Sequence, residues 1–412
     1  MNNESSQELT AALTALPVPG VTIGAVEAGI RYADRRDLVA LSFVPGTTAA
    51  AMFTKNAFCA APVIVAREHL ALCDAMPRLL LINTGNANAG TGDPGMAAAK
   101  ASCDAAAVAA GVKPSEVIPF STGVIGQDLP VDRLVAALPK LLAAQSSDHW
   151  EQAARGIMTT DTRPKLGSRE FEVDGTRYVL SGIAKGAGML RPDMATMLAF
   201  LATDAAISAP VLDTLLRRAV NGSFHRITVD GDTSTNDAVL LAATGATGTD
   251  RCDDPDSAMA QVFAEALESL CLELAQGLVR DGEGASKFVE IAVSGGRDEA
   301  ECLAVAFTIG HSPLVKTALF ASDPNWGRLL AAIGRAGVAD LDVRGVRVLI
   351  NDLPIAENGA RAVSYVEADV ARIMSETDLC IGVELGRGDA AVSIWTSDFS
   401  YDYVRINAEY RS

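Results

Sequence analysis

One threonine, Thr196, stands in a segment whose composition could support nucleophilic chemistry: KGAGMLRPDMATMLAFLATDA, residues 185–205. The segment opens with Lys185 and three small residues, passes a predicted turn at 191–193, and continues as an apolar run over 194–207. Threonine is a favoured strand residue, so an isolated threonine in such a run is ordinarily structural. A functional interpretation needs a chemical reason for the layout.

That reason is the way a threonine hydroxyl becomes reactive. The hydroxyl is a weak nucleophile until a base removes its proton. If the chain is cut immediately before Thr196, the new α-amino group, with an unperturbed pKa of about 7.7–8.0, can be that base. The cut requires the same hydroxyl to attack the carbonyl of Ala195, a small residue that leaves room for a tetrahedral intermediate. The layout therefore fits a self-cleaving threonine nucleophile.

The pattern KGAGM-x-x-P-x-M-A-T-M-L-A-F closely resembles the ornithine acetyltransferase (glutamate N-acetyltransferase) family of arginine biosynthesis. Further blocks of this resemblance follow in order from near residue 50 to the last residue. They are FTKNAFCAAPV (53–63), NTGNANAGTG (83–92), STGVIG (121–126), IMTTDTRPK (157–165), NGSFHRITVDGDTSTND (221–237), DGEGASKF (281–288), SDPNWGR (322–328) and INAEYRS (406–412). Together the blocks are far more specific than any one motif.

The resemblance implies that the chain is made as one precursor and cuts itself between Ala195 and Thr196. It implies an α chain, 1–195, and a β chain, 196–412, that form one interlocked body and assemble as a heterotetramer of two α and two β chains. It also implies a ping-pong reaction in which acetyl passes from N-acetylornithine to the threonine and then to glutamate. No cofactor is expected, and acetyl-CoA remains open as a further acetyl donor.

Residues Thr122 and Gly123, in STGVIG, match the pair that forms the oxyanion hole in the family. Taken alone, Ser-Thr-Gly after a strand is a turn. A backbone N–H beside a glycine and a hydroxyl are, however, suitable donors to an oxygen that gains negative charge in the transition state.

Further positions match substrate contacts of the family. Lys185 could hold a substrate carboxylate. The resemblance alone does not decide whether Thr159 or its neighbour Thr160 makes a second substrate contact. Glu283 would suit an ammonium or another polar group of the substrate. The substrate-binding set expected from the resemblance is Thr159, Lys185, Thr196, Glu283, Asn407 and Ser412. The chain ends in serine where the family commonly has threonine, which keeps the hydroxyl.

Composition excludes several other functions. A formal net charge of -17 disfavours binding to phosphate backbones, so no nucleic-acid partner is expected. The seven cysteines include no C-x-x-C pair and the four histidines form no H-x-x-x-H motif, so no metal site is expected and the histidines are interpreted as structural. No apolar run approaches the roughly 18 residues of a membrane span, and the first residues do not resemble a secretory signal. The protein is expected to be cytoplasmic.

The elements that must position these residues alternate between helix and strand patterns. Helical composition is seen at 96–111, about 256–279 and 300–320, and strand patterns at 116–126, 176–189, 379–386, 389–398 and 401–410. Interleaved strands and helices predict an α/β protein. The resemblance implies an N-terminal-nucleophile-type α/β/β/α sandwich, in which stacked sheets lie between helices, with a smaller C-terminal α/β region.

Three alternatives stay open at this point. The first is a member that also takes acetyl from acetyl-CoA. The second is an N-terminal-threonine amidohydrolase or aminopeptidase, which would pass the acyl group to water. The third is an amino-acid-binding protein without catalysis, which the presence of Thr196, Thr122, Gly123 and Lys185 disfavours.

Overall fold

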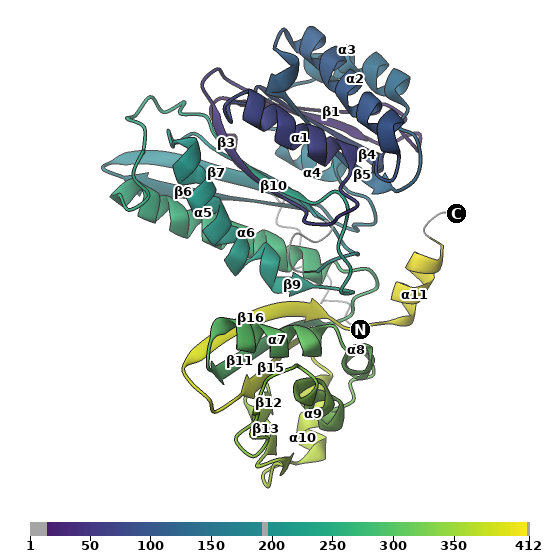
Figure 1. The fold of residues 1–412 in the computed structure, drawn as a ribbon, viewed down its shortest axis with the longest axis vertical. Helices are drawn as coiled ribbons and strands as arrows, with labels where there is room; N and C mark the ends of the chain where they lie inside the picture. The colour runs from purple at the N-terminus through teal and green to yellow at the C-terminus, as the bar shows by residue number, and fades with distance from the viewer. Residues whose placement is uncertain (1–14, 192–196, 410–412) are drawn as a thin grey trace, which may run out of the picture.

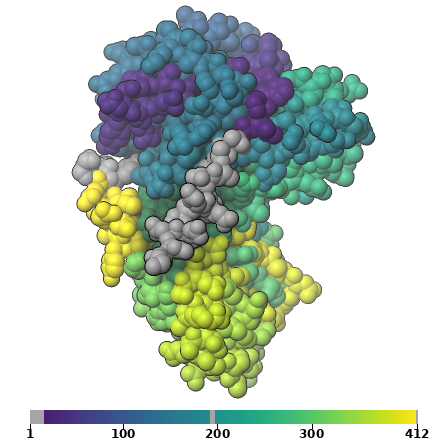
Figure 2. All heavy atoms as spheres, turned by 180° about the vertical axis from the view of Figure 1, so that it is seen from behind, coloured from purple at the N-terminus to yellow at the C-terminus, as the bar shows by residue number. Residues whose placement is uncertain are grey.

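The computed structural model describes residues 15–191 and 197–409, which form three β-sheets flanked by helices (Figure 1). Two of the sheets stack face to face in the larger part of the molecule. The third belongs to a smaller C-terminal lobe, which the space-filling view shows beneath the stacked sheets (Figure 2).

The first sheet has the strand order β1-β2-β4-β5, and its last two strands are parallel. Its strands are β1 Val21–Val26, β2 Leu38–Phe43, β4 Leu79–Asn86 and β5 Val117–Val124. The strands are buried almost throughout, as expected for a sheet covered on both faces.

The second sheet has the order β3-β10-β8-β7-β6. Its strands are β3 Thr48–Phe53, β6 Lys165–Val173, β7 Thr176–Lys185, β8 Leu198–Thr203 and β10 Ala238–Ala243. Strand β8, which begins shortly after Thr196, lies between β7 and β10 and is buried at every position.

Helices cover the outer faces of both sheets. The first sheet carries α1 Ala61–Leu72, α2 Gly92–Ala110 and α3 Val131–Ala143, and the second carries α5 Ala209–Gly222 and α6 Ala258–Arg280. Between the sheets lies an apolar core in which the rings of Phe120 and Phe200 meet edge to face at 4.8 Å. A fully buried Trp150, from the short helix α4 Trp150–Gly156, packs into the same core.

The C-terminal lobe is a seven-stranded sheet with the order β14-β13-β12-β15-β11-β16-β9. Its strands are β9 Ile227–Thr228, β11 Phe288–Gly296, β12 Arg347–Ile350, β13 Leu353–Glu357, β14 Ala360–Arg361, β15 Asp378–Glu384 and β16 Ala390–Ser397. Its helices are α7 Glu299–Gly310, α8 Pro313–Phe320, α9 Trp326–Gly334 and α10 Glu367–Met374. Two 3-10 turns, η1 Pro114–Glu116 and η2 Phe224–Arg226, lie in the larger part of the molecule. The expected α/β/β/α sandwich with a smaller α/β region is confirmed.

Two expectations about elements are wrong. The segment 401–410, expected as a strand, is the helix α11 Tyr401–Ala408, whose first turn is capped by the Ser400 hydroxyl. The segment 300–320, expected as one helix, is the pair α7 and α8, because Pro313 cannot continue the first helix and instead begins the second.

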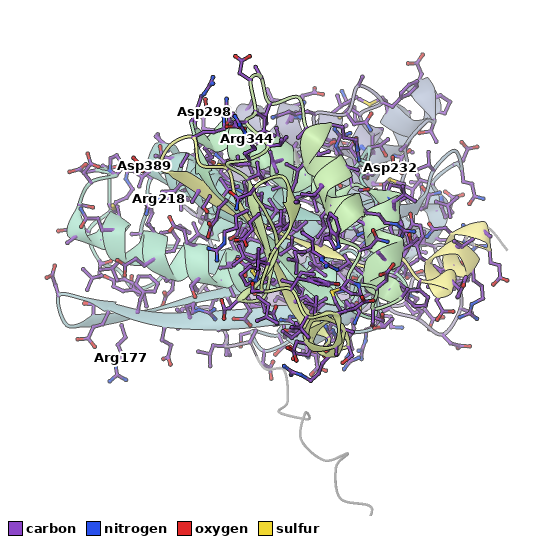
Figure 3. The ribbon with its side chains drawn as sticks, turned by 90° about the horizontal axis from the view of Figure 1, so that it is seen from below. Arg177, Arg218, Asp232, Asp298, Arg344 and Asp389 are labelled. Carbon is purple, nitrogen blue, oxygen red and sulfur yellow. The ribbon has the colours of Figure 1, made fainter. Side chains whose placement is uncertain are left out.

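The charge of the chain lies mainly on its outside. Figure 3 shows labelled acidic and basic side chains spread over both parts, with Arg177 at the start of β7 and Asp298 at the start of α7 projecting outward. Among the described residues no single helix is long and apolar enough to cross a membrane, and the bent pair α7 and α8 passes that test by length and composition only.

Candidate active site

Lys185 is the centre of the site that the structure describes. It is the last residue of β7 and pairs directly with Leu198, two residues beyond Thr196. Ala195 and Thr196, the predicted cleavage pair, lie outside the described residues. The pairing of Lys185 with Leu198 nevertheless places the lysine at the strand end to which Thr196 is covalently joined.

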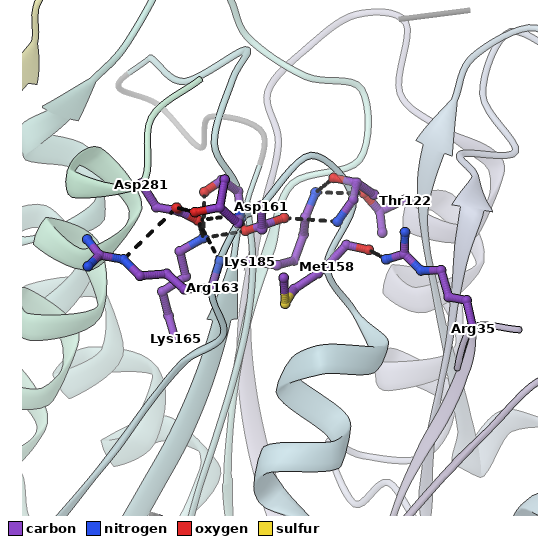
Figure 4. A network of polar contacts seen from close by, with 11 residues as sticks. Arg35, Thr122, Met158, Asp161, Arg163, Lys165, Lys185 and Asp281 are labelled. Carbon is purple, nitrogen blue, oxygen red and sulfur yellow. Dashed lines mark hydrogen bonds and ion pairs between the residues drawn. The ribbon is translucent and has the colours of Figure 1, made fainter. Parts of the chain in front are cut away.

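The Lys185 ammonium joins the two stacked sheets. Its Nζ donates hydrogen bonds to Thr122 Oγ1 at 3.0 Å and to Thr159 Oγ1 at 2.8 Å (Figure 4). Thr122 is near the end of β5 in the first sheet, whereas Thr159 lies between α4 and β6. An ammonium can only donate, so both hydroxyls accept from it and keep their own hydrogens to donate to another group.

Gly123, beside Thr122, has a φ of +136°, in the region that favours glycine. A Cβ at this position would lie 2.3 Å from the carbonyl carbon of Gly85, the residue paired with it on β4. The backbone here can therefore approach its neighbour only without a side chain. The Thr122–Gly123 pair offers a hydroxyl and main-chain groups at one strand end, which is an arrangement suited to stabilising an oxyanion.

A network of buried ion pairs lies next to Lys185. Its members fall within the blocks 157–165 and 281–288, but neither block indicated an ionic role for them. Asp161 Oδ1 accepts from Lys165 Nζ at 2.5 Å and from Gly186 N at 2.7 Å, and its Oδ2 accepts from Thr159 N at 2.9 Å. Lys165 also donates to Asp281 (Figure 4). The carboxylate of Asp161 thus fixes the backbone on both sides of the site.

Burial and charge act against each other on these groups. Burial works to raise the pKa of Asp161, but the nearby Lys185 and Lys165 outweigh it and hold that pKa at about 2. Burial lowers the pKa of Lys185, while Asp161 opposes this shift. Asp161 is therefore a fixed negative charge that helps Lys185 to stay protonated.

Asp237 is a second carboxyl that sequence reasoning missed. Its Oδ1 accepts the N–H of Met197 at 3.0 Å, the residue that follows Thr196. Its Oδ2 is buried without a hydrogen-bond partner among the described residues, and burial raises its pKa well above the usual range. Asp237 is the last residue of the block 221–237, and that block did not indicate a role for it.

Glu283 and Asn407 meet although they lie on different elements. Asn407 Nδ2, on α11, donates to Glu283 Oε2 at 2.8 Å. The carboxyl of Glu283 also lies against Gly188, where a Cβ would come within 2.5 Å of it. Ser412, expected with Asn407 in the substrate-binding set, lies outside the described residues.

The structure thus brings the expected residues together in two groups. Thr122, Gly123, Thr159 and Lys185 form one, and Glu283 with Asn407 forms the other; the charge of Glu283 also acts on Lys185. Within the described ranges, no three His, Cys, Asp or Glu side chains gather as metal ligands. The arrangement offers a cation, polarised hydroxyls and a carboxylate at one strand end, which suits acyl transfer on a substrate with both charges.

A model described as the ArgJ family matches residues 22–412. The chain is similar to the arginine biosynthesis bifunctional protein ArgJ of Pseudomonas syringae pv. tomato, at 51% identity over 96% of this chain and 97% of the relative. The protein of the same name from Pseudomonas fluorescens gives the same identity and coverage.

Two solved structures were also matched. The arginine biosynthesis bifunctional protein argJ from Bacillus halodurans is 37% identical, covers 50% of this chain and 96% of its own, and has a TM-score of 0.48. The ornithine acetyltransferase from Mycobacterium tuberculosis, complexed with ornithine, is 31% identical, covers 44% of this chain and 96% of its own, and has a TM-score of 0.38.

Proposed function

Because this chain belongs to the ArgJ family, which matches it over residues 22–412, we propose that it moves an acetyl group from N-acetylornithine to glutamate through an ester on Thr196. The chain is an acetyltransferase of arginine biosynthesis. Within that activity, the carrier residue, the cleavage and the order of steps are our proposal. The observation that carries it is the pair of hydrogen bonds from Lys185 to Thr122 and Thr159 beside the strand that follows Thr196.

The first half-reaction forms the ester. The Thr196 hydroxyl attacks the acetyl carbonyl and gives its proton to its own α-amino group, which self-cleavage after Ala195 has freed. Thr122, whose hydroxyl accepts from Lys185, donates to the oxyanion together with the main chain at Gly123. The amide bond breaks, the leaving nitrogen takes the proton, and ornithine departs.

The second half-reaction returns the threonine to its starting state. The amine of glutamate attacks the acetyl-threonine ester and loses its proton, and the Thr196 oxygen recovers one as N-acetylglutamate leaves. Lys185, Thr159, Glu283, Asn407 and Ser412 are proposed to hold the polar ends of the two amino acids. The opposite charges of Lys185 and Glu283 suit a ligand that carries both a carboxylate and an ammonium.

A mass measurement on the processed enzyme tests the covalent route. With N-acetylornithine alone, the β chain is expected to gain one acetyl group, and later addition of glutamate removes it as N-acetylglutamate. Loss of the acetyl group to water as acetate, at a rate that glutamate does not change, would instead identify an amidohydrolase. An unmodified β chain during full turnover would contradict the ester.

A second acetyl donor is favoured by the word bifunctional in the names of both relatives. We propose that acetyl-CoA also acetylates Thr196. The test is N-acetylglutamate formation from acetyl-CoA and glutamate without N-acetylornithine, with Thr196→Ala as the control that abolishes it.

The processed protein is proposed to work in the cytoplasm as two α and two β chains. The seven cysteines, which lie within the described part of the chain, are all free thiols, which supports a reducing compartment. Native mass spectrometry is the measurement that distinguishes this heterotetramer from a single αβ pair.

A further inference from the structure

A small cavity opens beside Lys185 and its partners Thr122 and Thr159, and the two arginines that line it have no part in the mechanism above. Its volume is about 190 Å³, and Gly123 and Thr159 belong to its wall. Two arginines, Arg31 and Arg35, also belong to the wall, and no acidic residue is found among its described lining residues. In a chain with a net charge of -17, such a pocket is an unusual concentration of positive charge.

Polar contacts hold the loop that carries both arginines. They lie on the loop between β1 and β2, where the carboxylate of Asp37 accepts from Ala28 N at 2.7 Å and from Ile30 N at 2.6 Å. Asp37 is only 3% exposed, so these bonds fix the backbone that leads into Arg31. Arg35 donates to the carbonyl of Met158, which precedes Thr159. The loop is therefore tied to the candidate site at Arg35.

Two glycines bring Arg31 close to the oxyanion position. A Cβ on Gly85 would lie 2.8 Å from the Cβ of Arg31, and Gly85 pairs with Gly123 in the first sheet. A Cβ on Gly123 would in turn lie 2.3 Å from the Gly85 carbonyl carbon, so a side chain at either glycine would collide with a neighbour. The side chain of Arg31 therefore starts one strand away from the proposed oxyanion donor.

The guanidinium of Arg31 has an unused donor. Its Nη1 is buried and makes no hydrogen bond with the residues that the structure describes. The guanidinium lies over the ring of Tyr32, 5.1 Å from its centroid, so only the hydrogen bond of Nη1 is missing. A buried donor without a hydrogen-bond partner is unfavourable, so a ligand that supplies an acceptor is stabilised there. A carboxylate matches the planar guanidinium because it can accept two parallel hydrogen bonds.

We propose that Arg31, with Arg35 beside it, binds the side-chain carboxylate of the glutamate acceptor; this assignment rests on the proposed function. The two amino acids of that reaction differ in the charge of their side chains, and only glutamate offers a second carboxylate. Drug-sized ligands occupy pockets of about 300–1,000 Å³, so this cavity fits one end of an amino acid rather than the nucleotide of acetyl-CoA. Arg31 therefore selects the acceptor and leaves acetylation by N-acetylornithine unchanged.

The test separates the two half-reactions in the variant Arg31→Gln. Acetylation of the β chain by N-acetylornithine, followed by mass without glutamate, is expected to stay within about twofold of wild type. The glutamate concentration that half-saturates removal of the acetyl group is expected to rise about 10- to 100-fold, as for loss of a charge-assisted hydrogen bond. Arg31→Lys is expected to restore part of this loss.

The matched control is Arg36→Gln, which removes the same charge from an exposed position on the same loop and is expected to behave as wild type. Unchanged half-saturation by glutamate in Arg31→Gln overturns the proposal, as does an equal loss in both half-reactions. A loss confined to acetyl-CoA as donor also overturns it and assigns the arginine to a phosphate. A wild-type β chain that is never acetylated contradicts the proposed function itself, which is a distinguishable result.

Discussion

At the scale of single residues, the site depends on a lysine whose protonation is maintained by buried carboxylates. Burial lowers the pKa of Lys185 and Asp161 works to raise it. The same lysine sets the direction of the Thr122 hydroxyl, because Thr122 accepts from it at 3.0 Å. Removing Lys185 is thus expected to affect the oxyanion donor as well as the substrate.

Lys185→Met is expected to lower the rate of β-chain acetylation by about 100-fold or more, the usual cost of losing an oxyanion donor. The measurement is single-turnover acetylation by N-acetylornithine, followed by mass. Lys100→Met is the control, since Lys100 pairs with Glu68 on the exterior. A Lys185→Met enzyme with the acetylation rate of Lys100→Met would exclude this role.

Asp237→Ala is expected to slow self-cleavage about tenfold, because Met197 loses the acceptor that fixes the residue after the nucleophile. Asp237→Asn keeps an oxygen acceptor and resembles the protonated carboxyl that burial favours, so it is expected to cleave at close to the wild-type rate. The half-time of precursor loss on a denaturing gel measures both. Equal half-times for Asp237→Ala and wild type would rule out the contact as a positioning device.

Sequence patterns led to Thr122, Gly123 and Lys185 because each lies in a distinctive local motif. Asp161 lies in the block 157–165 but its role could not be read from that block, and Arg31 lies in none of the blocks. Their importance comes from contacts between segments far apart in the chain, such as the approach of Arg31 to Gly85. Single-sequence periodicity carries no information about such contacts.

At the scale of elements, the C-terminal helix α11 was the clearest error. Alternating aromatic and polar residues in 401–410 suggested a strand. None of the residues in α11 is buried, however, so the alternation does not mark a face that packs against a core. The position of α11 follows instead from the bond of Asn407 to Glu283, in the loop before β11, and from the stacking of Tyr403 on the nearby Phe399 at 4.6 Å. The strands β15 and β16 were predicted correctly, because β15 alternates between buried and more exposed residues and β16 is buried over its second half.

A chain that ends at Ser400 is expected to fold but to lose substrate affinity. Helix α11 contributes little to the core, so the midpoint of thermal unfolding should change by only a few degrees. The KM for N-acetylornithine should rise at least about tenfold, because Glu283 loses Asn407. Asn407→Leu should reproduce much of this rise in the full-length chain, and an unchanged KM in both variants would contradict the assignment.

His311, which ends α7, is expected to make stability fall in mild acid. Burial, aided by the charges of Arg191, Lys316 and Arg335, lowers its pKa from 6.5 to about 4. Below pH 6.5 the His311 side chain is protonated in the unfolded chain, whereas in the folded chain it stays neutral until about pH 4. The free energy of unfolding therefore decreases as the pH falls from 6.5 to about 4.

Between pH 7 and pH 5 this effect amounts to about 2 kcal/mol in the free energy of unfolding. Urea unfolding of wild type and His311→Gln at both pH values measures it, since the variant lacks this proton uptake and the other groups cancel in the comparison. An equal loss of stability in both proteins would mean that His311 titrates normally in the folded state.

At the scale of the whole molecule, the proposed cut falls inside one folded body. The second sheet combines β3, β6 and β7 from before the cut with β8 and β10 from after it. Strand β8 hydrogen-bonds to β7 on one side and β10 on the other, so the two chains would share a buried sheet. This layering follows the resemblance, whereas the order of the strands could not be read from sequence because it depends on long-range pairing.

The two chains are accordingly expected to copurify under native conditions and to separate only in denaturant. Gel filtration at pH 7, with and without about 6 M urea, checks this expectation. Separation of the chains without denaturant would mean that the second sheet does not hold them together.

The central claim, that Thr196 cuts the chain and then carries the acetyl group, is tested most directly by the intact mass of the denatured protein. We predict two chains, with ends at Ala195 and Thr196, and one added acetyl group on the second after exposure to N-acetylornithine. Thr196→Ala is predicted to stay at the precursor mass of 42.9 kDa and to be inactive. A wild-type protein that remains at 42.9 kDa while transferring acetyl at full rate would contradict the account.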